Sequence, residues 1–174
     1  MKPLSQASLN RRSAQISDSK NETDPSARVL RQFRLIFSSI RRHFQNIEKV
    51  AGVGGAQIWA LSLIAQTPGL AVTQLSQAMD IHQSTASNLV RALLKAGFIH
   101  SEKSVHDKRV VELYTLPEGL KLLKKVPGPY TGVLPMALGE LAPETLSNLE
   151  RDLDALIKKL DVDEASAQTP MALM

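Results

Sequence analysis

The sequence predicts a mainly α-helical fold: a winged helix-turn-helix with a small β-hairpin wing, and helices at both ends of the chain that build a dimer. Three observations support this fold class. Residues 83–97 have the pattern of a helix with one apolar face and one polar, cationic face. A short helix precedes it across a three-residue link, and a hairpin with a basic tip follows it. Apolar stripes at helical spacing recur outside this region, towards both ends of the chain.

The two ends of the chain are polar. Residues 1–26 are rich in serine, asparagine, glutamine and charge and lack aromatic residues, so we expect disorder there. Because cations outnumber carboxylates up to Val50, two interpretations stay open: an untethered tail, and a basic arm that touches the DNA backbone. Residues 163–174 are also expected to be a disordered tail. The remaining residues, 27–162, are predicted to form a single domain.

Residues 27–50 are predicted to form a long helix with an apolar stripe. The stripe contains Val29, Phe33, Ile36, Phe37, Ile40, Phe44, Ile47 and Val50, with arginines off it. A helix this long has few partners in a small domain, so we expect it to pack on another subunit. The next helix, residues 56–65, is nearly all apolar and is expected in the core. Its Trp59 is interpreted either as a core anchor or as the lining of a ligand pocket.

The winged helix-turn-helix is predicted over residues 54–116. Residues 70–72 are expected to add a short strand beside the wing, and Thr73 to cap a short helix that runs to Met79. Residues 80–82 then form a tight link to the second helix. Its buried face is expected to hold Ala86, Leu89, Val90, Leu93 and Leu94. Its opposite face contains Ser84, Ser87, Asn88, Arg91 and Lys95, without a carboxylate. Such a face suits a polyanion with base edges between its phosphates.

The first turn of this second helix contains two hydroxyl side chains. Ser84 and Thr85 are positioned either to cap the helix or to bind phosphate, and we expect one of them to be the cap.

Further along the same helix, Arg91 is the best candidate for a base contact, because a guanidinium binds guanine in bidentate fashion. The alternative is that Arg91 is an ordinary solvated helix cation.

The wing is predicted as a hairpin. Gly97 suits the positive φ at a helix end, a strand begins at residues 98–99, and a polar stretch, residues 102–108, separates it from the β-rich residues 110–115. The candidate DNA contacts of the wing are Lys103, His106, Asp107, Lys108 and Arg109. Asp107 and Arg109 lie two apart and are expected to pair on one side of a strand. Whether that pair is structural or touches DNA stays open.

The chain beyond the wing predicts two more helices. Residues 118–125 form the first, and the prolines near 127–129 end it. Pro135 and Gly139 are expected to keep the next segment irregular. The last helix opens at Pro143, and its leucines follow steps of three and four, like the seam of a coiled coil. Residues 27–50 and 118–162 are therefore predicted to form the dimer interface through Phe33, Phe37, Ile40, Leu146, Leu149, Leu153, Leu156 and Leu160.

Composition narrows the function. The 174 residues carry a net charge of +4 and a pI near 9.5, which favours an anionic partner. The chain has no cysteine, so there is no disulfide, thiolate metal site or thiol redox switch. Its four histidines are scattered, and no catalytic motif occurs; we expect no enzyme, no metal and no cofactor. No stretch reaches the roughly 18 apolar residues of a membrane span, so we expect a cytoplasmic protein without membrane contact.

The reading region resembles the MarR family of transcription regulators. The resemblance rests on Gln-Ser-Thr-Ala-Ser-Asn-Leu-Val at 83–90, Leu-Lys-Ala-Gly-Phe-Ile at 94–99 and Asp-Lys-Arg at 107–109. The family pattern closes the wing with Leu-Thr, whereas this chain has Thr115-Leu116, and Pro-Glu-Gly at 117–119 follows as is usual in the family. The resemblance covers roughly residues 32–160.

That resemblance implies a function. It implies a homodimer that binds double-stranded DNA at an inverted-repeat operator, with the Asp107–Arg109 pair shaping the wing and Arg109 reaching the minor groove. It also implies a repressor released by a small-molecule effector between the dimerisation helices and the reading head, although the sequence does not show the pocket residues. The alternative is a winged-helix module that uses the same helix face to bind protein.

Overall fold

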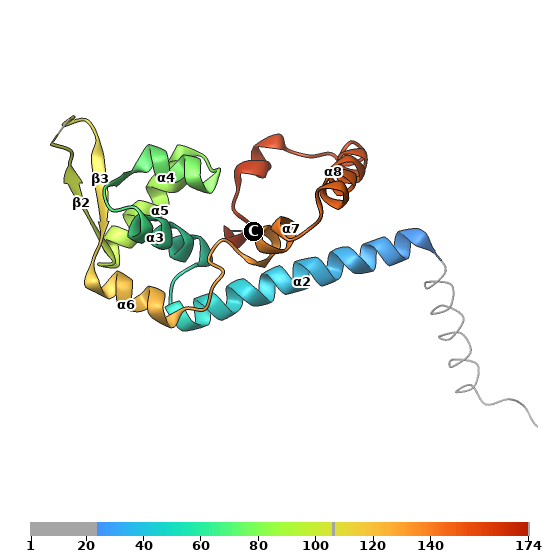
Figure 1. Ribbon diagram of the computed structural model, residues 1–174, viewed down its shortest axis with the longest axis horizontal. Helices are drawn as coiled ribbons and strands as arrows, with labels where there is room; N and C mark the ends of the chain where they lie inside the picture. The colour runs from blue at the N-terminus through green and yellow to red at the C-terminus, as the bar shows by residue number, and fades with distance from the viewer. Residues whose placement is uncertain (1–23, 106, 174) are drawn as a thin grey trace, which may run out of the picture. The chain divides into compact units, whose positions relative to one another are not determined.

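A computed structural model of the chain describes residues 24–105 and 107–173 (Figure 1). The chain separates into two compact units, Met1–Ser39 and Ile40–Met174. The boundary falls inside helix α2 (Pro25–Ala51), which contains the predicted helix of residues 27–50. The N-terminal prediction of disorder lies almost entirely outside the described residues, and its last two residues, Pro25 and Ser26, already belong to α2.

The described part of the first unit, residues 24–39, is a helical segment without a core of its own. None of its residues is buried. Phe33 is half-buried, Phe37 is exposed, and their rings stack with centroids 6.4 Å apart. These residues therefore leave the predicted apolar stripe accessible along this part of α2.

The second unit contains the rest of α2 and a series of short elements. In chain order these are α3 (Gly55–Gln66), β1 (Leu70–Ala71), α4 (Val72–Met79), α5 (Gln83–Lys95), β2 (Ile99–Lys103), β3 (Val111–Thr115), α6 (Pro117–Lys125), α7 (Val133–Gly139), α8 (Pro143–Ile157), η1 (Glu164–Gln168) and η2 (Met171–Leu173). The strands form an antiparallel sheet in the order β1-β3-β2, with Leu70 opposite Leu113 and Ile99 opposite Thr115. This arrangement confirms the predicted fold class of a winged helix-turn-helix within a mainly helical chain.

Helix α3 is the centre of the packing in this unit. It is apolar nearly all round, as the sequence predicts for a core helix. Leu61 and Ile64 are fully buried in a cluster with residues of α4, α5 and the sheet, including Leu75, Leu93 and Leu113. Ile58, from the same helix, is buried in a second cluster whose members are Ile40, Phe44, Ile47, Ile58 and Val126. The two clusters hold α5 on one side of α3 and the second half of α2 on the other.

Several local predictions differ from the structure. Helix α4 begins at Val72, and the Ala71 amide donates to Gln74 Oε1 over 2.9 Å, so Thr73 is not the N-cap. Leu94 was expected on the buried face of α5 but is 38% exposed. Pro135 lies in the first turn of α7, where a proline costs little, so this segment is helical rather than irregular.

The C-terminal residues also differ from expectation. The predicted disordered tail, residues 163–174, contains the 3₁₀ helices η1 and η2, and Pro170 is buried. Ala172 packs against both core clusters. The physical reason is that residues 170–173 are apolar, unlike the polar residues before them, and can bury surface against α3. In the part of the chain that the structure describes, no helix is long and apolar enough to cross a membrane.

Candidate nucleic-acid interface

Helix α5 presents two faces of opposite character. Ala86, Leu89, Val90 and Leu93 are buried against α3 and α4. Ser84, Asn88, Arg91 and Lys95 are all exposed and follow one another at helical spacing on the other side. Because the buried face fixes the rotation of the helix, these four side chains face solvent together. The helix ends at Lys95 with Ala96 as its C-cap, and Gly97 follows with a φ of 71°, as the sequence predicts for this glycine.

Arg91 and Asn88 form a pair on this exposed face. Arg91 Nη1 donates a hydrogen bond to Asn88 Oδ1 over 2.8 Å. The bond limits the rotamers of both side chains, which reduces the entropy that either would lose on binding. It occupies one guanidinium N–H and one amide oxygen, so the remaining N–H groups of both side chains can still donate to an acceptor outside the helix.

The first turn of α5 corrects one expectation. The N-cap is His82, which makes no side-chain capping bond, so neither Ser84 nor Thr85 is the cap. Ser84 is exposed and Thr85 is half-buried. Ser87 Oγ donates to the Gln83 carbonyl oxygen over 2.8 Å, a bond from one turn of a helix to the previous one. Ser87 can therefore accept a hydrogen bond from a ligand, but its own hydrogen is already used.

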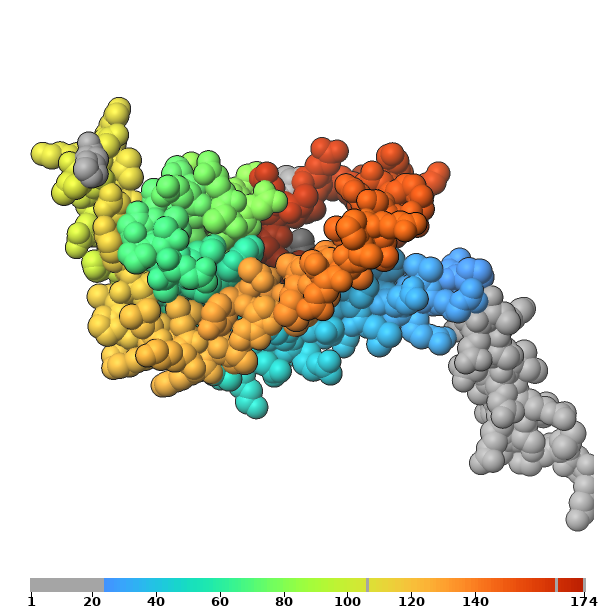
Figure 2. All heavy atoms as spheres, viewed as in Figure 1, coloured from blue at the N-terminus to red at the C-terminus, as the bar shows by residue number. Residues whose placement is uncertain are grey.

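The wing is the hairpin of β2 and β3. The strands pair from Ile99 opposite Thr115 to Lys103 opposite Val111, and the Ser104 amide donates to the Val110 carbonyl just beyond. Lys103, Lys108 and Arg109 are exposed near this tip. Figure 2 shows the yellow hairpin standing out from the packed atoms of the neighbouring helices. His106, also predicted as a wing contact, lies outside the described residues.

Asp107 and Arg109 form the predicted pair, in a turn rather than on a strand. The Val110 amide donates to the Asp107 carbonyl over 2.8 Å, which closes a tight turn before β3 begins. Arg109 Nε donates to Asp107 Oδ1 over 3.1 Å, and Nη2 donates to Oδ2 over 3.2 Å. The Arg109 amide also donates to Oδ1 over 3.0 Å. These bonds, chiefly those of the side chain, lower the pKa of Asp107 below its ordinary value of 3.8, so it is ionised near neutral pH.

The strands of the wing carry a pair of acidic side chains, one step from the last strand pair before the tip, that the sequence analysis missed. Glu102 on β2 lies opposite Glu112 on β3. Tyr114 donates its hydroxyl to Glu112 Oε2 over 2.8 Å, and this bond raises the pKa of Tyr114 above its ordinary value of 10.0. The His100 ring stacks on Tyr114 with centroids 5.3 Å apart. The strand register, which brings the two glutamates together, was not specified by the sequence analysis.

The residues predicted to form the dimer interface are mostly exposed, both on α2 and in the C-terminal part of the chain. Helix α8 buries none of its residues: Leu146, Leu149 and Leu156 are exposed and Leu153 is half-buried. Leu160 lies beyond the end of α8 and is 56% exposed. Ile40, in contrast, is buried in the second core cluster and has little surface left for a partner. Among the described residues, no group of three or more histidine and acidic side chains is placed to hold a metal ion.

Comparison with known proteins identifies the same region. The model of the MarR family matches residues 56–111, which contain nearly all of α3, the helix-turn-helix, strand β2 and the tip of the wing. A putative transcriptional regulatory protein for the hcr operon of Thauera aromatica is 29% identical over 89 residues, which are 51% of this chain and 54% of that protein. The match therefore spans about half the length of this curated relative.

Solved structures share the fold. A MarR family transcriptional regulator of Streptomyces coelicolor, Sco3205 in complex with DNA, has a TM-score of 0.55 at 21% identity, over 83% of this chain and 94% of that one. The S. aureus MepR–DNA complex has a TM-score of 0.53 at 20% identity, over 81% of this chain and 99% of that one. The family match and the winged helix-turn-helix at the same residues agree with the resemblance inferred from the sequence. Residues 56–111 of the chain therefore match the MarR family.

Proposed function

We propose that this chain is a cytoplasmic, homodimeric transcription regulator that binds double-stranded DNA in a sequence-specific manner and represses until a small molecule releases it. The observation that carries the proposal is the exposed face of α5, where Ser84, Asn88, Arg91 and Lys95 stand together without a carboxylate. A helix of this kind fits the major groove, in which guanidinium and amide groups recognise base edges. The solved DNA complexes of two proteins with the same fold support the assignment.

The wing supplies the second contact in this proposal. Lys103 and Lys108 are exposed at the hairpin end and suit phosphate, to which a flexible ammonium binds as a point charge. Arg109 is more than nine-tenths exposed despite its bonds to Asp107. Its guanidinium therefore remains accessible to a minor groove beside the helix. Asp107 has the role of holding that arginine in place.

Two copies of the chain account for the exposed apolar residues at both ends. Phe33 and Phe37 on α2 and the leucine stripe of α8 are the surfaces that we assign to the dimer. A two-fold dimer implies an operator with two inverted half-sites, whose centres lie about one helical turn, roughly 34–36 Å, apart. Footprinting tests this assignment, and a single asymmetric footprint would contradict it.

Selection of bound fragments from the source genome, followed by titration at several salt concentrations, tests the function as a whole. Release of counterions gives DNA binding a steep dependence on salt. The alternative is a module that uses the Ser84–Lys95 face to bind protein; a small protein interface would lack that slope. If no fragment is enriched and affinity for duplex DNA does not vary with salt, the proposal is wrong.

Arg91→Ala is expected to weaken binding to cognate DNA by roughly 1–3 kcal/mol, because the lost contact is to a base. Binding to random DNA should weaken much less. Lys108→Ala is the comparison variant, because it removes a phosphate contact. It should weaken binding to both duplexes alike and lower the slope of log affinity against log salt concentration by about one. Fluorescence anisotropy on both duplexes measures the two variants. Equal losses on cognate and random DNA for Arg91→Ala would remove α5 from the reading role.

The Asp107–Arg109 pair gives a separate test of the wing. If Arg109 contacts DNA, Arg109→Ala should weaken binding clearly more than Asp107→Ala, which removes only the group that orients the arginine. If the pair is purely structural, the two single variants and the double variant should be equally weak. Binding of all three variants to cognate DNA, compared at one salt concentration, distinguishes the two outcomes.

A further inference from the structure

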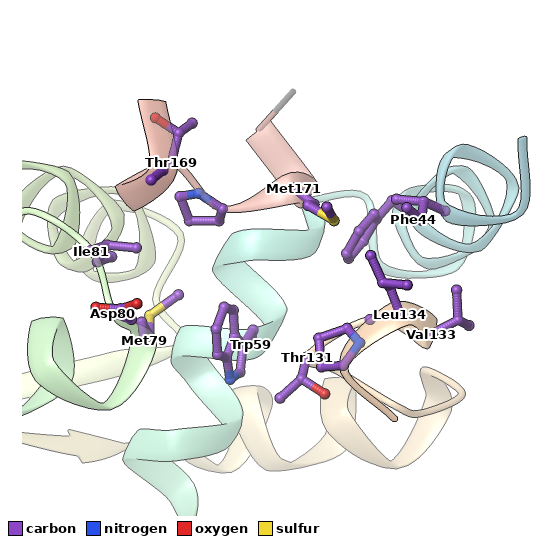
Figure 3. A pocket seen from close by; sticks show the side chains of 15 residues that line it. Phe44, Trp59, Met79, Asp80, Ile81, Thr131, Val133, Leu134, Thr169 and Met171 are labelled. Carbon is purple, nitrogen blue, oxygen red and sulfur yellow. The ribbon is translucent and has the colours of Figure 1, made fainter. Parts of the chain in front are cut away.

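A cavity of about 170 Å³ lies within the second unit, between the helix-turn-helix and the C-terminal segment. Its walls come from five parts of the chain: the second half of α2, helix α3, the turn between α4 and α5, the segment of residues 131–135, and the segment of residues 167–171. Figure 3 shows Trp59 of α3 between Met79, Asp80 and Ile81 on one side and Thr131 and Leu134 on the other. Trp59 thus lines this cavity and also packs against the first core cluster, as expected for a core anchor.

The size and the lining restrict what the cavity accepts. An apolar cavity of about 150 Å³ holds a benzene ring, so this one has room for a single ring with a small substituent. Most of its lining is apolar, including Phe44 and Trp59, and Thr131 and Thr169 also line it. Among the described residues that line the cavity, Asp80 is the only ionisable one. Because none of these lining residues is a lysine, arginine or histidine, an anion would lose its water without gaining a charged partner there.

We propose that this cavity is a binding site for a ring-sized organic cation. In the bound state the ring lies against Trp59 and the apolar lining, and the ammonium group lies towards the Asp80 carboxylate at the exposed edge. An ammonium beside the face of an indole gains a further attraction from the ring electrons. Asp80 thereby determines the charge of the preferred ligand, and Trp59 supplies the largest flat surface.

The position of the site suggests what binding does. Asp80 and Ile81 belong to the link that ends α4 and leads into α5, and Asp80 has a φ of 51° as the α4 C-cap. On another wall, residues 167–171 hold Thr169 and the buried Pro170 against the cavity. A ligand therefore touches the backbone that positions α5. That the bound ligand changes DNA binding rests on the proposed function. Binding of the cation to the cavity does not rest on it.

Trp59 is the only tryptophan in the chain and reports on the cavity directly. The experiment titrates the full chain, without DNA, with benzylammonium, benzyl alcohol and benzoate, and follows tryptophan fluorescence together with calorimetry. We expect saturable binding of benzylammonium, about tenfold tighter than benzoate, with benzyl alcohol between them. No saturable binding of benzylammonium, or binding of benzoate as tight as that of benzylammonium, would overturn the proposal.

Asp80→Asn is the matched variant, because asparagine also tolerates a positive φ and keeps the turn. This variant should bind benzylammonium about two- to fivefold more weakly and bind benzyl alcohol with unchanged affinity. An unchanged preference for the cation in this variant would overturn the role of Asp80. Operator binding by the unliganded chain is measured separately: its absence would contradict the proposed function and leave the fluorescence result standing, whereas failure of the ligand titration with intact DNA binding would contradict this site alone.

Discussion

A chain that carries both Leu149→Asp and Leu153→Asp is expected to be monomeric and to bind its operator at least a hundredfold more weakly. The two leucines lie near the middle of the α8 stripe, and no residue of that helix is buried in the described chain. Aspartates there would place two charges in an apolar interface without a partner. A monomer reaches only one half-site at a time, and loss of two-site binding lowers affinity by about 10²–10⁴.

Light scattering and operator titration measure the two effects together. The matched control is Asn148→Asp with Ala155→Asp, which adds the same charge to α8 away from the leucine stripe. The control should remain dimeric and bind DNA nearly as the parent does. A leucine variant that stays dimeric at micromolar concentration would place the interface elsewhere, with α2 as the first surface to examine.

Gly119→Ala is expected to destabilise the fold by roughly 1–3 kcal/mol, although alanine favours helices over glycine by about 1 kcal/mol. Gly119 is the only buried residue of α6. A Cβ at this position would collide with the Phe98 carbonyl oxygen and lie 2.9 Å from Thr115 Cγ2. The Phe98 carbonyl also accepts the Leu116 amide over 2.9 Å, so moving it would weaken the connection between the wing and α6.

Urea unfolding of the parent and the variant measures this difference. Gly139→Ala, at the end of α7, is the control, because a Cβ there would meet no atom within 4 Å. It should leave the free energy of unfolding unchanged or slightly raised. Equal stability of the two variants would show that α6 moves away from Phe98 without cost.

The elements that the sequence predicted well are those with a strong local pattern. The apolar spacing of Leu89 and Leu93 fixes the buried face of α5, and Gly97 marks its end. The short strand at residues 70–72 also forms, as β1 at Leu70–Ala71. Local propensity and tertiary packing agree at these positions, so the pattern alone was sufficient.

The features that escaped prediction depend on residues far apart in the chain. Ala172 packs beside α3 across more than a hundred residues, and nothing near it in the sequence indicates such a partner. The same holds for the cavity, where Asp80 and Thr169 meet only after folding. At the start of α5 several neighbouring residues were alternative N-caps. Both Ser84 and Thr85 suit an N-cap, yet the helix begins earlier, after His82.

The distribution of charge along the hairpin has a consequence for the speed and direction of encounter. Glu102 and Glu112 lie opposite each other on the strands, whereas Lys108 and Arg109 lie at the tip. In the field of a duplex, the carboxylates are repelled and the cations attracted, so the hairpin experiences a torque that turns its tip towards the phosphates. Association would then begin from the correct orientation more often, and glutamine at both glutamate positions should lower that orientational bias most at low salt.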